Sequence, residues 1–256
     1  MALLTDGNPN DALALEVYES AILNVAHVET IDLEIKLTLA TAELAEDVLD
    51  VLLDHARAFD PESTIRRSKG VSDVVVSPQM QRWHALHTLE IVYRDAFNDQ
   101  LNDRYQAKFL EYRQLSKDAF AHTVRFGIGL ALTPIPQAQQ AVLSAVGGNG
   151  AAGTFYVQVS WVSASGQEGA PSDATAFATA AQQNLMVQPL NPPPVATGFN
   201  VYIGPTEGTL ARQNASPIAV GQTFTIPNGG LIAGAAPGTG QAADIFVVGG
   251  PTLRRG

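Results

Sequence analysis

The chain has 256 residues, of which 46% are hydrophobic and 16% are charged, and its formal net charge is −10. This composition excludes a disordered chain, and no apolar run approaches the ~18 residues that a membrane-spanning helix needs. The acidic balance argues against affinity for nucleic acid or anionic lipid, and the absence of cysteine excludes disulfide scaffolds, thiolate-bound zinc and thiol nucleophiles.

The composition changes near residue 140. Residues 1–140 contain 21 of the 25 acidic residues and all five histidines, whereas residues 141–256 contain 18 of the 22 glycines. Charged sequence rich in leucine and alanine is typical of amphipathic helices, and glycine or proline between short β-branched runs is typical of strands and turns. We therefore predict an α+β multidomain protein. It should have a helical domain over residues 1–140, a glycine-rich linker over 141–153, and an antiparallel β-sandwich with a C-terminal arm over 154–256.

Two helices are predicted before residue 60. The first is capped by residue 10 or 11 and runs to about Val28. The second begins after Thr30 and ends at Phe59. Its opening, residues 31–39, alternates like a strand, but the strongly helical sequence that follows favours a helix throughout. Apolar residues recur in it at close to helical spacing, at Leu44, Val48, Leu49, Leu52 and Leu53.

After a loop with a short strand at residues 74–76, one long helix is predicted from Gln79 to about Phe126, because this stretch lacks proline and glycine. It would be ~70 Å long at 1.5 Å per residue. Its apolar residues recur every four positions, so the stripe drifts around the helix and one straight neighbour cannot cover it. The stripe packs either against the first two helices or against another subunit. Its aromatic members are the candidate subunit contacts Tyr93, Phe97, Tyr105 and Phe109.

The second half predicts short strands separated by turns. In residues 155–162, Phe155, Val157, Val159 and Trp161 fall on one face. Further strands are predicted at residues 175–179, 198–204 and 222–227. The tail from residue 243 forms either a final strand or an arm that reaches another subunit.

The motifs that could carry chemistry are weak. Residues 148–153 match GxGxxG, but they precede a strand rather than a helix, so we interpret them as linker. His84, His87 and Glu90 have a spacing that could ligate a metal, but no second cluster completes a site. The second half has no histidine, so no Ser-His-Asp set is indicated. We therefore predict a protein that is not an enzyme and that holds no metal or cofactor.

Two parts of the sequence resemble proteins of tailed bacteriophages. Residues 83–112, WHALHTLEIVYRDAFNDQLNDRYQAKFLEY, together with GIGLALTPIP at 127–136, resemble helical head-tail adaptor (neck or connector) proteins. Residues 156–172, YVQVSWVSASGQEGAPS, together with FNVYIG at 199–204, resemble the fibronectin-III or Ig-like modules of phage structural proteins. These stretches make up 63 of the 256 residues.

The resemblance implies a virion protein, assembled in the host cytoplasm, that forms a ring matching a portal, with twelve subunits. The ring would dock between the portal protein and a tail-side neck or tail terminator protein, with the Ig-like half outward, and it would carry no catalytic residues. Leu253, Arg254 and Arg255 are the candidate portal-docking arm. Residues 6–60 contain 13 acids and two bases, and we expect some of these carboxylates, or those of the long helix, to line the channel and repel passing DNA.

Three other classes stay open at this point. A carbohydrate-binding module would use Trp161 or Tyr202 as a stacking platform, although Trp161 lies on the face predicted to be buried. A hydrolase with an Ig-like accessory domain would need a catalytic constellation that the sequence does not show. Another phage structural component, such as a decoration protein, a tail terminator or a baseplate protein, is poorly separated from an adaptor by sequence.

Overall fold

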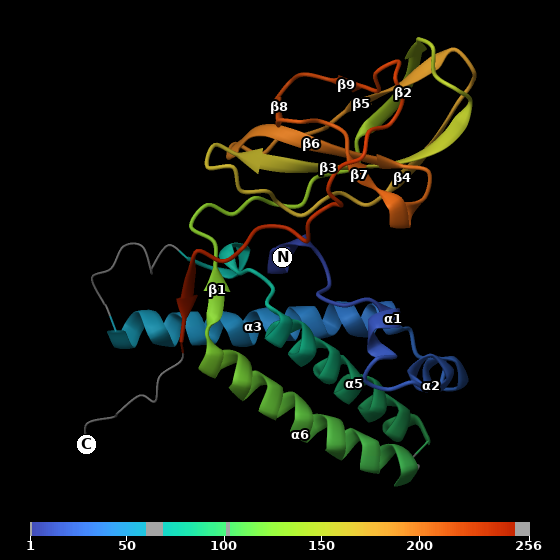
Figure 1. The fold of residues 1–256 in the computed structure, drawn as a ribbon. Coiled ribbons are helices and arrows are strands. Elements are labelled where there is room, and N and C mark those ends of the chain that lie inside the picture. Colours follow the sequence, from blue (N-terminus) through green and yellow to red (C-terminus); the bar gives the residue numbers. More distant parts are fainter. Residues whose placement is uncertain (1, 60–68, 101–102, 249–256) are drawn as a thin grey trace. The chain divides into compact units, whose positions relative to one another are not determined.

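The computed structural model describes residues 2–59, 69–100 and 103–248, without the side chains of 55–59, 99–100 and 103. Long helices in the first half are followed by antiparallel sheets in the second (Figure 1). The predicted α+β architecture is therefore confirmed.

The chain divides into two compact units, at boundaries other than those predicted. The sandwich unit contains the residues up to Asp6 together with Thr133–Ala242, and the helical unit contains Gly7–Leu132 together with the residues after Ala242. The predicted division at residue 140 is thus too late. The described tail returns to the helical unit rather than extending from the sandwich.

The helical unit is built from five helices and one turn of 3-10 helix within the described residues. The predicted first helix is in fact two short ones, and Asp11 caps the earlier by accepting from the Ala14 N–H at 2.7 Å. The predicted second helix is confirmed. Asp32 caps it by accepting from the N–H groups of Glu34 and Ile35 at 2.9 and 3.2 Å. The elements are α1 (Ala12–Leu15), α2 (Ile22–Val28), α3 (Leu33–Phe59), η2 (Val71–Asp73), α5 (Pro78–Gln100) and α6 (Asp103–Phe126).

The predicted single rod over residues 79–126 is wrong. α5 and α6 are separate helices that pack together as a hairpin, and α5 also contacts α3, so α5 lies between the other two (Figure 1). The sequence at residues 98–103, NDQLND, explains the break, because four of its six residues are Asn or Asp. Such residues favour caps and turns over helix interiors.

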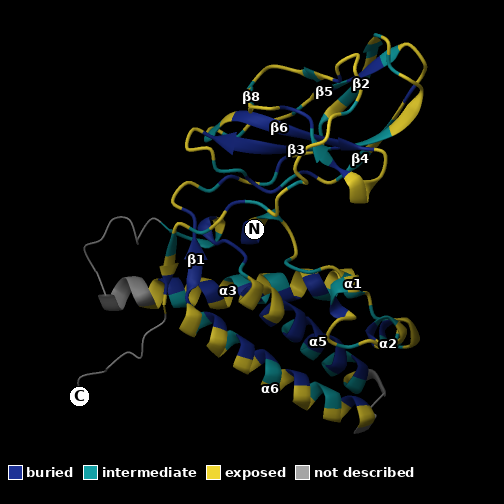
Figure 2. Ribbon diagram, viewed as in Figure 1, coloured by how far each residue is buried: buried dark blue, intermediate teal, exposed yellow. Residues whose placement is uncertain are grey.

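The central position of α5 makes it the most buried helix of the unit (Figure 2). Trp83 is 2% exposed, and its ring centroid lies 4.8 Å from that of Phe120 on α6. Further residues of α5 are buried at nearly every turn: Met80, Leu86, Leu89, Ile91, Val92, Tyr93 and Ala96.

Two short strands complete the helical unit. β1 (Ile128–Leu130) pairs antiparallel with β10 (Ile245–Val247), so the described part of the tail is a strand. The short strand expected at residues 74–76 is reduced to two bridge residues, Val74 and Val75, and Val74 pairs with Leu130. The proposed arm residues Leu253, Arg254 and Arg255 lie outside the described residues.

The sandwich unit has two antiparallel sheets. The strand order of the larger sheet, β4-β3-β6-β7, is the C′-C-F-G order of Ig-like sandwiches, and β8 extends the edge that β7 begins. The strands predicted at residues 155–162, 175–179 and 198–204 are confirmed. The larger sheet contains β3 (Gly153–Ser163), β4 (Thr175–Thr179), β6 (Ala196–Gly204), β7 (Ala211–Arg212) and β8 (Ile218–Ala219). The smaller contains β2 (Val142–Gly147), β5 (Gln183–Gln188) and β9 (Phe224–Thr225).

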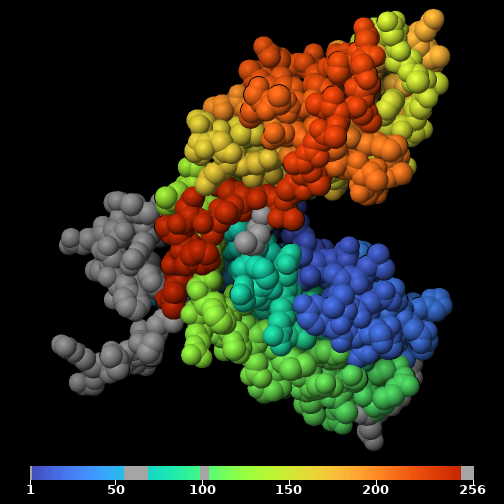
Figure 3. All heavy atoms as spheres, viewed as in Figure 1, coloured from blue at the N-terminus to red at the C-terminus, as the bar shows by residue number. Residues whose placement is uncertain are grey.

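The core of the sandwich lies between the two sheets. Alternate residues of β3 and β6 face it, as the predicted one-face pattern of β3 requires, and the smaller sheet contributes Leu185 and Val187. Trp161 and Phe199 meet edge to face, with ring centroids 6.3 Å apart. After β9 the chain follows the sandwich surface without regular structure (orange to red in Figure 3), and Ala235 O accepts from the Arg212 N–H at 2.8 Å.

The predicted linker over residues 141–153 is wrong. It contains β2 and the loop from β2 to β3, and this loop belongs to the sandwich. Gly148 N–H donates to Gln182 O at 3.0 Å, and Gln182 N–H donates to Gly150 O at 2.8 Å. A Cβ atom on Gly150 would lie 2.1 Å from the Gln183 carbonyl oxygen. The glycines therefore permit close packing, rather than freedom of movement.

Phe199→Ala should destabilise the sandwich unit by about 3–5 kcal/mol, because Phe199 is fully buried and its removal leaves a cavity. Unfolding in denaturant is followed by the fluorescence of Trp161 in a Trp83→Phe background, which separates the two units. Ile232→Ala is the control, since Ile232 is 50% exposed and should cost less than about 1 kcal/mol. Equal effects of the two substitutions would contradict this core assignment.

Candidate functional site

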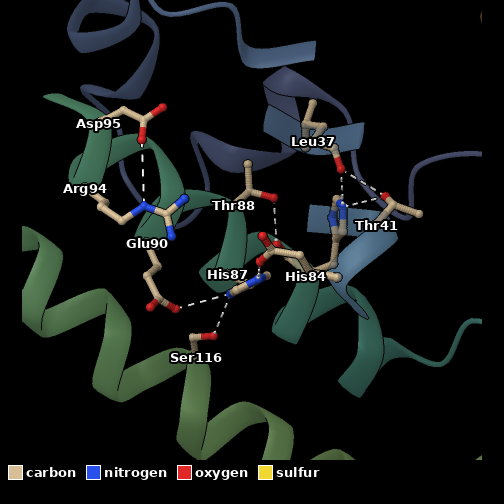
Figure 4. Close-up of polar contacts among 10 residues, drawn as sticks. Leu37, Thr41, His84, His87, Thr88, Glu90, Arg94, Asp95 and Ser116 are labelled. Atoms are coloured by element: carbon tan, nitrogen blue, oxygen red, sulfur yellow. Dashed lines mark hydrogen bonds and ion pairs between the residues drawn. The ribbon is translucent and has the colours of Figure 1, made fainter. Parts of the chain in front are cut away.

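Two histidines of α5 occupy the polar centre of the helical unit (Figure 4). His84 is fully buried. Its Nδ1 lies 3.0 Å from Asn10 Nδ2, and its Nε2 lies 3.1 Å from Leu37 O and 2.9 Å from Thr41 Oγ1. A neutral ring with its hydrogen on Nε2 satisfies both sides. Burial lowers the pKa of His84 to about 4, so the ring is neutral at pH 7.

His87 has the opposite electrostatics. Its Nε2 lies 2.6 Å from Glu43 Oε2 on α3, and its Nδ1 lies 3.2 Å from Glu90 Oε2 and 3.3 Å from Ser116 Oγ on α6. Burial by itself would lower the pKa of His87, but the hydrogen bonds and charges of Glu90 and Glu43 outweigh it, so the pKa is raised. The ring of His87 on α5 therefore contacts both α3 and α6, and these contacts are strongest when the ring is protonated.

His84, His87 and Glu90, whose spacing could ligate a metal, instead make hydrogen bonds that hold the helices together. The structure brings His87 and Glu90 together but gives His84 separate partners. Within residues 2–59, 69–100 and 103–248, no group of three or more His, Asp or Glu side chains is arranged to hold a metal ion.

Two of the aromatic interface candidates are buried in the chain itself. Tyr93 and Tyr105 are each 3% exposed, and their ring centroids lie 6.2 Å apart across the α5–α6 hairpin. Tyr93 also stacks on Tyr112 at 5.5 Å. The predicted subunit contact therefore becomes an internal one, because the fold-back brings the two halves of the stripe face to face. Phe97 and Phe109 are half-buried.

Carboxylates from the segment between α1 and α2 and from the C-cap of α2 bind this tyrosine cluster. Tyr112 O–H donates to Glu19 Oε2 at 2.9 Å, and Lys108 Nζ reaches the same oxygen at 2.8 Å. Tyr105 O–H donates to Glu29 Oε1 at 2.6 Å. Two carboxylates of the predicted acidic face, Glu19 and Glu29, therefore make hydrogen bonds within the chain.

The surface that sequence reasoning missed lies on α3. Leu49 and Leu53, expected in the core, are 38% and 43% exposed, and Ile35 and Leu39 are 61% and 38% exposed. The sequence does contain a signal for this surface. A second set of apolar residues recurs at helical spacing in α3, on a different side of the helix from the buried set. These four residues form what we call the α3 outer stripe.

Neither aromatic residue proposed for sugar stacking is available on the sandwich. Trp161 and Tyr202 are each 2% exposed. Tyr202 O–H donates to Glu168 Oε1 at 2.5 Å, and Ser160 Oγ donates to the same oxygen. Burial and the Glu168 hydrogen bond raise the pKa of Tyr202 to about 12. The stacking-platform prediction is therefore wrong for both residues.

One end of the sandwich contains a pocket of about 460 Å³. Its lining is neutral and mostly apolar, and Asn184 Oδ1 beside it is buried without a hydrogen-bond partner among the described residues. Because no charged group lines it, the pocket offers no acid–base chemistry. The lining includes Asn149, Phe155, Asn184, Leu185, Asn228 and Leu231.

Comparison of the chain with protein families, curated proteins and solved structures found no match. Over the part of the chain that the structure describes, no helix combines the length and apolar character of a membrane-spanning segment.

His87→Gln should destabilise the helical unit by about 2 kcal/mol near pH 6, because it removes a charged hydrogen-bonding group from Glu43 and Glu90. The pKa of His87 is raised, so its stabilisation is complete below the unfolded value of about 6.5 and is lost as pH rises through the folded value. His84 acts in the opposite sense, since its stabilisation is lost as pH falls toward its lowered pKa.

The measurement is denaturant unfolding followed by helical circular dichroism at pH 6 and pH 9. The exposed His122 provides the matched control, His122→Gln, which should change stability little at either pH. A stability difference between wild type and His87→Gln that is the same at both pH values would contradict the assigned role.

Proposed function

We propose that the protein is a structural subunit of a tailed-bacteriophage virion, a head-tail adaptor whose copies form a ring between portal and tail. The single observation that carries the proposal is the α3 outer stripe. Its four residues, Ile35, Leu39, Leu49 and Leu53, are exposed on the same side of one helix. Exposed apolar surface of this kind marks interaction sites. The resemblance of residues 83–112 to adaptor proteins supplies the specific role.

The polar groups of the helical unit also support an assembly role over an enzymatic one. His84, His87 and Tyr112 make their hydrogen bonds to other groups of the same unit, including Leu37 O, Glu43 and Glu19. This arrangement holds the unit rigid, which suits a ring component more than a site that must bind and release substrate. Twelve copies would match a portal, as the resemblance implies.

The acidic character of α3 fits passage of DNA through such a ring. Glu46, Asp47 and Asp50 are exposed on this helix. Carboxylates that line a channel repel phosphates and keep the duplex from binding. Another virion component, such as a decoration, tail terminator or baseplate protein, is the second candidate, because it would need the same exposed apolar stripe.

Negative-stain microscopy of the purified protein, with and without a portal, tests the proposal. We expect rings with a central channel, alone or seated on the portal. Particles that remain monomeric and leave the portal bare would contradict an adaptor, and rings that stack only on tail tubes would favour a tail terminator.

Deletion of residues 249–256 tests the proposed docking arm that contains Leu253, Arg254 and Arg255. The deletion preserves β10, which ends at Val247. We expect weaker portal binding with unchanged circular dichroism. Portal binding equal to that of the full chain would refute the arm.

A further inference from the structure

Helix α3 is apolar on two opposite faces. One face packs toward α5 and is buried at Leu37, Ala40, Leu44, Val48 and Leu52. The other is exposed at six positions, 35, 39, 42, 46, 49 and 53. At about 100° per residue, the second set is centred ~160° from the first.

The exposed set has the spacing of a docking seam. Its steps alternate between four and three residues, which is the heptad pattern that keeps one face against a partner helix. Five of the six residues are apolar, and Glu46 is the exception. The set spans 18 residue steps, or ~27 Å of helix, enough for five turns of contact. A helix is therefore the occupant that this face fits.

Charge determines which helix can lie there. Glu46 lies in the seam and the exposed Asp50 lies beside it, so the α3 of a second copy would bring carboxylate against carboxylate. Like charges placed together across an interface cost several kcal/mol. The occupant should instead present basic residues.

Helix α6 of the same protein has such a face. Its sequence contains five bases and three acids. Opposite its buried residues Tyr105, Tyr112, Ser116 and Thr123, it exposes a face that includes two bases and two alanines, and Asp118 beside this face accepts from Gln114 Nε2 at 3.0 Å. That face is formed by Ala107, Leu110, Gln114, Lys117, Ala121 and Arg125.

The two faces fit each other in shape and in charge. The alanines of α6 leave room for the leucines of α3. Glu46 is the fourth of six seam positions, and Gln114 and Lys117 are the middle two of the α6 face. In either helix direction, Glu46 therefore meets one of these two side chains, both of which can donate a hydrogen bond to it.

We propose that the outer face of α3 in one copy docks on the outer face of α6 in the next copy. Because α5 lies between α3 and α6 in each copy, both surfaces remain available at once. The contact is then heterologous, and repetition of it closes a ring when the rotation allows. This inference supplies the lateral contact of the adaptor ring and so rests on the proposed function, but its main measurement, self-association, requires neither portal nor tail.

The decisive experiment is a charge exchange in the full chain. Glu46→Lys and Lys117→Glu should each raise the Kd of self-association about tenfold or more at low ionic strength, measured by sedimentation velocity. If the two helices run parallel, an equimolar mixture of these variants should restore association, since each new lysine then meets a new glutamate. If they run antiparallel, a mixture of Glu46→Lys with Gln114→Glu should restore it instead, and failure of both mixtures would contradict the contact. Both substituted side chains are exposed, and circular dichroism checks that the variants fold.

A second pair of variants tests the apolar part of the seam. Leu49→Ser should weaken self-association about tenfold, whereas Leu190→Ser should leave it unchanged. Both leucines are 38% exposed, but Leu190 lies in the sandwich unit. The comparison therefore separates the seam from a general loss of surface hydrophobicity.

Several results would overturn the inference. A wild-type chain that stays monomeric would do so, as would association that none of these variants changes. Rescue of Glu46→Lys by wild type, with Lys117→Glu unaffected, would show α3 paired with α3. Loss of binding only to an added portal would assign the seam to another protein. Association that follows the charge exchange in a ring that binds no portal would support the contact and defeat the adaptor proposal instead.

Discussion

In the helical unit, α5 packs against α3 and against α6, so its side chains from Met80 to Ala96 are largely removed from water. A helix enclosed in this way must satisfy its polar groups internally. Thr88 Oγ1 donates to His84 O at 2.8 Å, and the rings of His84 and His87 bind groups from both neighbouring helices. The contacts with α5 decide which faces of α3 and α6 are buried. The opposite faces of these two helices are therefore the ones that remain exposed.

The sequence predicts α3 from the strongly helical stretch that follows its ambiguous opening, and Asp60-Pro61 ends the helix pattern. The structure adds the signal for the start, which is the cap by Asp32. The α5–α6 break was missed because the absence of proline and glycine was taken as sufficient for a continuous helix. The Asn and Asp residues at 98–103 were the counter-signal. The drifting aromatic stripe is a second signal against a continuous helix. No single straight helix can cover such a stripe, but a chain that folds back into a hairpin buries its two halves against each other.

In the sandwich, strands with regular alternation were predictable and the others were not. β3 alternates from Phe155 to Trp161 and was located from sequence, whereas β5, with the sequence QNLMVQ, shows no such period. The glycine-rich loop was misread because glycine serves both flexible linkers and close backbone packing. Only the position of Asn184 and the Gln183 carbonyl, far away in sequence, distinguishes the two uses.

The same ambiguity affects the candidate site. Leu44, Leu49 and Leu53 fit one helical pattern when counted together, yet α3 buries the first and exposes the other two. Two interleaved apolar faces on one helix cannot be told apart without knowing which neighbour is present. An apolar face that stays in water lacks the stabilisation of about 25 cal/mol that burial gives for each Å² of apolar surface. Glu46 within the exposed face and Asp50 beside it oppose pairing of identical faces, so this surface selects its partner by charge. The combination of exposed leucines and acidic neighbours is therefore more consistent with directed assembly than with a solitary chain.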